Sequence, residues 1–184
     1  VNFAVTVTRF DACKYVEDAI RAVAELIRRG NDVKLLLVGD GLLRVELESL
    51  ANTLDISNDV IFAGFQSQEW LATVLPRATV ILSPHMGRAL TEAALAGVPV
   101  VAYDYDWQRE VVDDGKTGFL VPHKEWTGLS DKVEYILNYP NDGKTMGKNI
   151  RQKISDMMNP KVLDWHEQNE YSKLLVRFSE EAEA

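Results

Sequence analysis

Short apolar runs alternate with amphipathic stretches along most of this chain, and this alternation restricts the folds open to it. Six runs have the length and composition of buried strands: Phe3–Thr8, Val33–Val38, Val60–Ala63, Thr79–Leu82, Val98–Tyr103 and Gly118–Val121. Between them, apolar residues at helical spacing predict helices over Val16–Arg29, Leu42–Leu54, Glu69–Leu75 and Leu90–Ala96. Strands that alternate with helices pair in parallel through right-handed crossovers. We therefore predict an α/β fold: a doubly wound, Rossmann-like parallel sheet with helices on both faces.

The chain after Trp126 is predicted to be helical. Helical spacing covers Thr127–Leu137, Gly143–Met158 and a last helix within residues 160–184. The stretches Asn138–Gly143 and Asn159–Pro160 contain helix-breaking residues and are predicted as the breaks. A length of 184 residues suits one core, and no repeat or linker divides the chain. We therefore treat residues 1–184 as a single domain with a helical C-terminal tail.

Charge and cysteine content exclude several function classes. The net charge of −8, from 20 basic and 28 acidic residues, disfavours binding to nucleic acid. No apolar run approaches the ~18 residues that a membrane span needs. The single cysteine, Cys13, cannot form an internal disulfide and fits a reducing compartment. The sequence therefore predicts a cytoplasmic protein.

Polar residues and glycines follow the predicted strands, at the point where each strand ends. In a doubly wound sheet, ligands bind outside the carboxyl ends of the strands. Five strand ends carry such residues: Arg9 after the first, Gly39-Asp40-Gly41 after the second, Gly64-Phe65-Gln66 after the third, Ser83–Arg88 after the fourth and Asp104–Gln108 after the fifth. We expect the binding site at this edge of the sheet.

The segment Ser83–Asp104 carries the most specific signal at this edge. It contains a turn with Gly87 and Arg88, a short alanine-rich helix, a Gly-Val-Pro corner and a buried strand. The unpaired N–H groups of such a helix start attract phosphate, and a glycine lets the backbone approach it closely. Glu92 lies about one turn into the helix, where its carboxylate can accept hydrogen bonds from a sugar hydroxyl. The segment is typical of a site for a sugar nucleotide.

Two cations, Arg9 and Lys14, flank the loop RFDACK after the first strand. Taken alone, they read as surface charges. Together with the helix start at Gly87 and Arg88, they are placed to neutralise a diphosphate, because a guanidinium can bridge two phosphate oxygens.

Further polar residues on the same edge have more than one interpretation. Asp104 and Asp106 lack a third oxygen ligand in the sequence, so hydrogen bonding to ligand or backbone is favoured over a metal, and no metal site is predicted. Trp107 is expected either to wall a sugar pocket or to cover the core. His85 is a candidate for substrate contact.

In order and spacing, these motifs resemble the C-terminal, donor-binding domain of the group 1 (family 4) retaining glycosyltransferases, which have the GT-B architecture. The resemblance covers about Phe3 to Val121. It rests on RFDACK as an Arg-x4-Lys clamp, on LLLVGDG, VIFAGFQSQEW and TVILSPH as strand-loop landmarks, on TEAALAGVPVVAYD, and on DDGKTGFLV.

The resemblance implies roles for individual residues. Arg9 and Lys14 are expected to contact the diphosphate and Glu92 the ribose, and these three are assigned to catalysis. Donor-binding residues are then expected at Gly39, Phe65, Gln66, His85, Met86, Gly87, Arg88, Ala89, Leu90, Asp104, Asp106 and Trp107, with the backbone around Gly87–Leu90 holding phosphate and sugar. The resemblance also implies transfer with retention, no bound metal or other cofactor, and a donor phosphate that helps to take the acceptor proton.

The resemblance further implies a partner domain. Enzymes of this architecture bind the acceptor on an N-terminal domain, and the start at Val1 without a methionine leads us to expect a fragment of such a protein. Peripheral membrane association through that missing half stays open.

One residue departs from the family pattern. The first glutamate of the Glu-x7-Glu pair would fall at position 84, where this chain has Pro84. That glutamate meets the donor sugar, so sugar recognition is expected to differ, with His85, Asp104 or Asp106 as candidate replacements. A sugar-nucleotide epimerase of the same architecture, and a non-catalytic nucleotide-sugar-binding domain, remain alternatives to a transferase.

Overall fold

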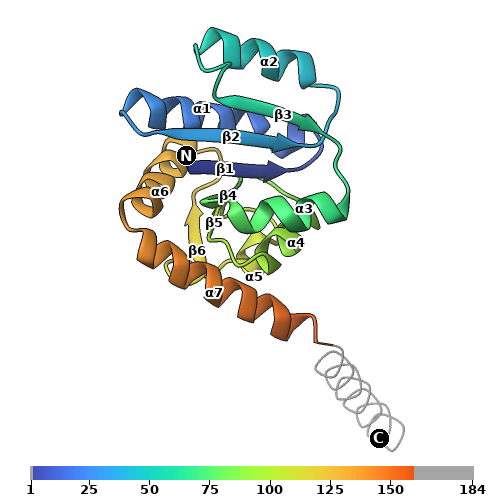
Figure 1. Ribbon diagram of the computed structural model, residues 1–184, viewed down its shortest axis with the longest axis vertical. Helices are drawn as coiled ribbons and strands as arrows, with labels where there is room; N and C mark the ends of the chain where they lie inside the picture. The colour runs from blue at the N-terminus through green and yellow to red at the C-terminus, as the bar shows by residue number, and fades with distance from the viewer. Residues whose placement is uncertain (1, 160–184) are drawn as a thin grey trace, which may run out of the picture.

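A parallel sheet of six strands forms the centre of the molecule, as the alternation in the sequence predicts. The computed structural model describes residues 2–159. The strand order is β3-β2-β1-β4-β5-β6, with every pair parallel (Figure 1). The strands are β1 (Asn2–Val7), β2 (Val33–Val38), β3 (Val60–Gly64), β4 (Val80–Ser83), β5 (Val100–Tyr103) and β6 (Gly118–Val121). Each predicted strand is confirmed, with its ends within two residues of the expected positions.

Helices cover both faces of this sheet, which confirms the doubly wound fold (Figure 1). The helices are α1 (Val16–Arg28), α2 (Arg44–Thr53), α3 (Gln68–Val74), α4 (Ala89–Leu95), α5 (Gln108–Val111), α6 (Trp126–Asn138) and α7 (Pro140–Met157), with short 3₁₀ helices η1 (Ala12–Lys14) and η2 (Leu75–Arg77). Helices α1, α2 and α6 contribute to the core on one face, and α3, α4, α5 and most of α7 to the core on the other.

The two cores follow from the alternation of side chains along each strand. Ala4 of β1 belongs to the core under α1, and its neighbour Val5 belongs to the core under α4. All residues of β4 and β5 are buried, because a parallel sheet that is covered on both faces has no solvent side.

The sheet changes its winding direction between β1 and β4. The chain moves outward from β1 through β2 to β3, then returns to pair β4 on the other side of β1. In such a sheet, this switch leaves a crevice beyond the carboxyl ends of the strands. The fold therefore places the binding site at the ends of β1 and β4.

The helices after β6 differ in one detail from the prediction. The break was expected over Asn138–Gly143, but α6 runs through Asn138 and α7 already begins at Pro140. Proline is well suited to the first position of a helix, so it starts α7 here. Gly143, buried inside α7, lets the helix pack closely on Ile136 and Pro99. Helix α5 was not predicted, and the helix expected within residues 160–184 lies outside the described residues.

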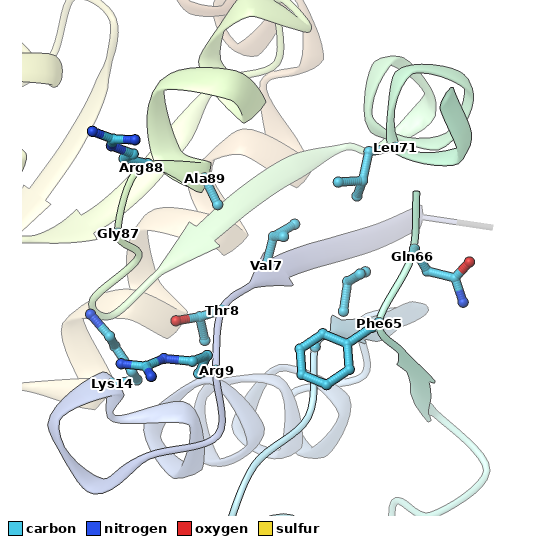
Figure 2. A pocket seen from close by; sticks show the side chains of 12 residues that line it. Val7, Thr8, Arg9, Lys14, Phe65, Gln66, Leu71, Gly87, Arg88 and Ala89 are labelled. Carbon is cyan, nitrogen blue, oxygen red and sulfur yellow. The ribbon is translucent and has the colours of Figure 1, made fainter. Parts of the chain in front are cut away.

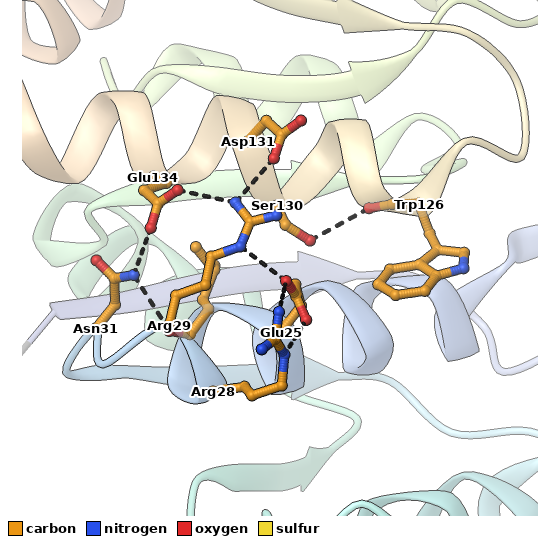
Figure 3. A network of polar contacts seen from close by, with 9 residues as sticks. Glu25, Arg28, Arg29, Asn31, Trp126, Ser130, Asp131 and Glu134 are labelled. Carbon is orange, nitrogen blue, oxygen red and sulfur yellow. Dashed lines mark hydrogen bonds and ion pairs between the residues drawn. The ribbon is translucent and has the colours of Figure 1, made fainter.

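A network of charged side chains joins α1 to α6 (Figure 3). Arg29 is the residue directly after α1. It donates to Glu25 of α1 and to Asp131 and Glu134 of α6, each at 2.8 Å. Asn31 donates to the second oxygen of Glu134 at 2.8 Å. The network bridges the surfaces of α1 and α6, whose apolar residues share one core.

Candidate functional site

A pocket of about 450 Å³ opens at the carboxyl ends of the first four strands (Figure 2). It is lined by Val7, Thr8, Arg9, Lys14, Val38, Gly39, Phe65, Gln66, Leu71, Gly87, Arg88 and Ala89. Eight of these were singled out in the sequence: Arg9, Lys14, Gly39, Phe65, Gln66, Gly87, Arg88 and Ala89. The structure therefore gathers residues from four separate loops and helix starts around one cavity.

The two predicted cations lie on the same side of the pocket (Figure 2). The Arg9 side chain is 72% exposed, and its Nε lies 3.4 Å from Asp11 Oδ2. Lys14 ends the 3₁₀ helix η1 and is half-buried. Within residues 2–159 the Lys14 ammonium forms no ion pair, so it is available to an anion in the pocket.

The loop between β4 and α4 forms another part of the pocket wall. Helix α4 begins at Ala89, with Arg88 before it. In the described part of the chain, the N–H groups of Gly87, Arg88 and Ala89 have no hydrogen-bond acceptor. No protein atom lies within 4 Å of the point where a Cβ on Gly87 would stand, so this backbone is open to a ligand. The Arg88 side chain leaves the loop on the side away from Phe65 (Figure 2).

Gln108, at the start of α5, holds this loop through hydrogen bonds of its side-chain amide. Gln108 is completely buried, and its amide uses all of its hydrogen-bonding capacity. Its Nε2 donates to the carbonyl oxygens of Pro84 (3.0 Å) and Tyr103 (3.1 Å). Its Oε1 accepts from Ser83 Oγ (2.5 Å) and from the Met86 N–H (3.4 Å). Sequence reasoning placed Gln108 on the right edge but gave it no role, because the carbonyls that it contacts converge only in the folded chain.

The floor of the pocket needs a glycine after β2. Gly39 has φ +131°, and a Cβ at this position would lie 1.9 Å from the carbonyl oxygen of Thr8. The segments after β1 and β2 can therefore approach each other this closely only if residue 39 is a glycine. Phe65, 75% exposed, and Gln66 stand at the rim after β3.

Three predicted residues lie behind the pocket wall. The side chains of Met86 and Leu90 are fully buried in the core under α4, so only their backbone is near the site. Glu92 lines a second pocket, of about 410 Å³, between α3, α4 and α7. Its Oε2 accepts from Gln68 Nε2 at 3.0 Å. Leu71 lines both pockets and separates them.

The remaining predicted residues lie beside the pocket, in the loop after β5. Asp104 forms an exposed ion pair with Arg109 at 2.9 Å. Asp106 lies 3.2 Å from Nε2 of His85, whose Nδ1 lies 2.9 Å from the carbonyl oxygen of Cys13. Trp107 is half-buried and packs against the core under α4, which favours a role in covering the core over one in a sugar pocket.

Aromatic side chains support the loops on the α1 side of the site. Tyr105 stacks on His123 with ring centroids 4.0 Å apart, and Tyr15 meets His123 edge-on at 4.9 Å. Burial is the main cause that lowers the pKa of His123, with Lys124 and His85 adding to it. Burial also raises the pKa of Tyr103, whose hydroxyl donates to Asp18 at 2.8 Å.

No three or more His, Cys, Asp or Glu side chains within residues 2–159 are grouped to hold a metal ion. No helix in the same range is long and apolar enough to cross a membrane.

Comparison with known proteins identifies a family and a fold. Residues 1–153 match the family described as glycosyl transferases group 1. The chain is 32% identical, over 147 residues, to an α-D-kanosaminyltransferase from Streptomyces kanamyceticus, covering 78% of this chain and 38% of that protein. It is 28% identical to N-acetyl-α-D-glucosaminyl L-malate synthase from Bacillus anthracis, covering 91% of this chain and 45% of that protein.

Solved structures agree with this fold. Sucrose-phosphate synthase from Thermosynechococcus elongatus aligns with a TM-score of 0.80 at 27% identity, covering 96% of this chain and 46% of that one. Anabaena Alr3699/HepE, solved with UDP and glucose, aligns with a TM-score of 0.81 at 23% identity, covering 93% of this chain and 48% of that one. The chain thus spans less than half of the length of each of these four proteins.

Proposed function

The chain belongs to the glycosyl transferases group 1 family, and from this membership we propose that it binds the nucleotide-diphosphate sugar donor of a sugar transfer. The observation that carries the proposal is that Arg9, Lys14 and the β4–α4 loop line one pocket. A diphosphate needs cations together with unpaired N–H donors, and this pocket offers both. The HepE structure holds UDP and glucose, the nucleoside diphosphate and the sugar that make up such a donor.

The proposed chemistry is electrostatic. When the bond between the sugar C1 and the phosphate oxygen breaks, negative charge grows on the departing diphosphate. Arg9 and Lys14 are placed to stabilise that charge, and donors fixed in advance in a protein site are worth more than donors in water. The acceptor hydroxyl forms the new bond to C1, and its proton goes to the departing phosphate. As the family resemblance implies, we propose retention at C1 and no resident metal or other cofactor.

The ribose is proposed to lie between the two pockets that share Leu71. In this position its hydroxyls reach the Glu92 carboxylate, which Gln68 already holds at 3.0 Å. The base then lies near Phe65 and Gln66, at the rim formed after β3.

The acceptor is proposed to bind elsewhere in the full-length protein. The chain spans 38% and 45% of two of its curated relatives, so a complete enzyme of this family has room for a second domain. We propose that an N-terminal domain supplies the acceptor and closes over the donor. The epimerase alternative is not favoured, because the family and the kanosaminyltransferase relative are named as transferases.

Titration with a panel of UDP-, GDP- and ADP-sugars tests the proposal. We expect one nucleotide class to bind this chain in calorimetry, and Lys14→Ala to weaken that binding. Lys116→Ala is the matched control, because Lys116 is exposed and lies outside the pocket. Absence of binding by every member of the panel would contradict the proposal. A full-length protein that binds donor but neither hydrolyses nor transfers it would instead support the non-catalytic alternative.

A further inference from the structure

We propose that His85 is a positioning residue for Lys14, through a hydrogen bond to the peptide that precedes the lysine. This inference rests on the proposed function, because it gives Lys14 the diphosphate as its ligand. His85 lies outside the set of side chains that line the pocket. It joins two loops, the one between β1 and α1 and the one after β5, and it stands on a third, between β4 and α4.

The imidazole makes both of its polar contacts with acceptors. Nδ1 lies 2.9 Å from the carbonyl oxygen of Cys13, and Nε2 lies 3.2 Å from Oδ2 of Asp106. A carbonyl and a carboxylate accept hydrogen bonds and cannot donate them. A proton on Nδ1 therefore makes the contact with Cys13 a hydrogen bond, and a proton on Nε2 does the same for the contact with Asp106. The His85 side chain is 11% exposed, so water reaches it poorly as an alternative partner.

The contact with Cys13 acts directly on Lys14. The carbonyl of Cys13 belongs to the peptide unit whose nitrogen is that of Lys14, and the Lys14 N–H donates to the carbonyl of Asp11 at 2.9 Å. The peptide before the lysine is thus held at both of its polar atoms. A side chain on a fixed peptide loses less entropy when it binds an anion.

Both loops that His85 joins contain a residue in the left-handed backbone region. Tyr15 has φ +50° and Asp106 has φ +55°, in the left-handed region that a bulky residue such as tyrosine rarely adopts. Such conformations persist only where surrounding contacts hold them. His85 provides a contact beside each of them. Its ring also meets Tyr105 edge-on, at 5.4 Å between centroids.

His85 itself is fixed by the loop that carries it. The neighbouring Pro84 carbonyl and Met86 N–H are both bound by the buried amide of Gln108. The backbone on both sides of His85 is therefore held in place, which fixes where the imidazole lies. The imidazole in turn fixes the Cys13–Lys14 peptide through the Cys13 carbonyl.

Two amide substitutions separate the two hydrogen bonds of His85. In His85→Asn, the side-chain amide nitrogen replaces Nδ1 and retains a donor toward Cys13. In His85→Gln, the amide nitrogen replaces Nε2, so the donor toward Cys13 is lost. We expect His85→Gln to weaken binding of the tightest of UDP, GDP and ADP by about 3- to 10-fold, the usual range for one lost hydrogen bond, and His85→Asn by less than about 2-fold.

A double-mutant cycle with Lys14→Ala distinguishes positioning from general damage. If His85 acts through Lys14, His85→Gln has no further effect on affinity once Lys14 is alanine. Asp113→Asn is the control for loss of an exposed ion pair, because Asp113 binds Lys153 of α7 at 2.8 Å, away from the pocket. It is expected to leave affinity unchanged.

Hydrogen–deuterium exchange of the ligand-free chain gives a readout independent of the nucleotide. Peptides covering residues 9–15 are expected to exchange faster in His85→Gln than in His85→Asn. Equal exchange in the two variants, or equal affinity losses that persist without Lys14, would overturn the positioning role. A wild-type chain that binds none of the three nucleotides would instead refute the proposed function.

Discussion

At the scale of single residues, the proposed function depends most on Arg9 and Lys14. In the full-length enzyme we expect Arg9→Ala and Lys14→Ala each to lower the turnover rate about 100- to 1,000-fold, as when one preorganised donor is removed from a charge-stabilising site. Steady-state kinetics with the preferred donor measure the effect, and Lys116→Ala serves as the surface control. Near-normal turnover in both pocket variants would show that the diphosphate is held elsewhere.

Gly39 carries the sharpest steric requirement in the site. We expect Gly39→Ala to lower the free energy of unfolding by about 2–4 kcal/mol, because the new Cβ would lie 1.9 Å from the Thr8 carbonyl oxygen and φ is +131°. Gly30 is the matched control: its φ is +89°, but no atom lies within 4 Å of its Cβ position. Gly30→Ala should cost about 1–2 kcal/mol. Equal losses in urea denaturation would mean that backbone strain alone, and not the clash, sets the cost at Gly39.

Residue-level prediction from sequence worked where the residue type itself carries the chemistry. The cations and glycines of the four loops were found because charge and backbone freedom are visible in the sequence, and the structure brings Arg9, Lys14, Gly39 and Gly87 to one pocket. Gln108 was missed because a buried amide has no sequence signature until its partners converge. Met86 and Leu90 were included because of the family resemblance, but the β4–α4 loop buries the side chain of Met86 and helix α4 buries that of Leu90.

At the scale of elements, we expect the junction between α1 and α6 to be sensitive to acid. Hydrogen bonds from Arg28 and Arg29 lower the pKa of Glu25 from its ordinary value of 4.5 to about 2. A carboxylate with a lowered pKa stabilises the folded chain above pH 4.5, and the contribution is lost as the pH falls toward 2. We therefore expect Glu25→Gln to be less stable than the wild type at pH 7 and to approach it by pH 2–3.

Chemical denaturation at pH 7, 4 and 3 measures this difference. Glu46→Gln is the control, because Glu46 is exposed on α2 and forms no ion pair in the described part of the chain. A stability difference between wild type and Glu25→Gln that does not change with pH would contradict the role of the Glu25 charge.

The elements themselves were largely predictable, for a physical reason. Strands buried on both faces and helices with one apolar stripe leave clear periodic signals, so β1 to β6 and the six longer helices of the described residues appear where expected. Helix α5 spans four residues, too few for a period to show. Pro140 was read as part of a break, although it occupies the position where proline starts a helix.

At the scale of the whole molecule, we expect this chain alone to bind the donor but not to transfer the sugar. Donor at 100 times its dissociation constant should stabilise the chain by about 2.7 kcal/mol, a rise in Tm of about 5–10 °C. Scanning calorimetry measures the shift, and product analysis with a radiolabelled donor sugar tests for transfer. Robust transfer by the isolated chain would show that no second domain is required.

The residues that line the pocket all come from the N-terminal half of the chain, and this matters when segments of two related proteins are joined into one chain. Every residue that lines the pocket lies between Val7 and Ala89, although β5, β6 and the helices that follow complete the fold. A chimera joined near residue 90 should therefore inherit its nucleotide preference from the N-terminal parent. The contacts of His85 with Asp106 and of Pro84 with Gln108 cross that junction. Parents that differ at these positions are expected to yield folded hybrids with an impaired site.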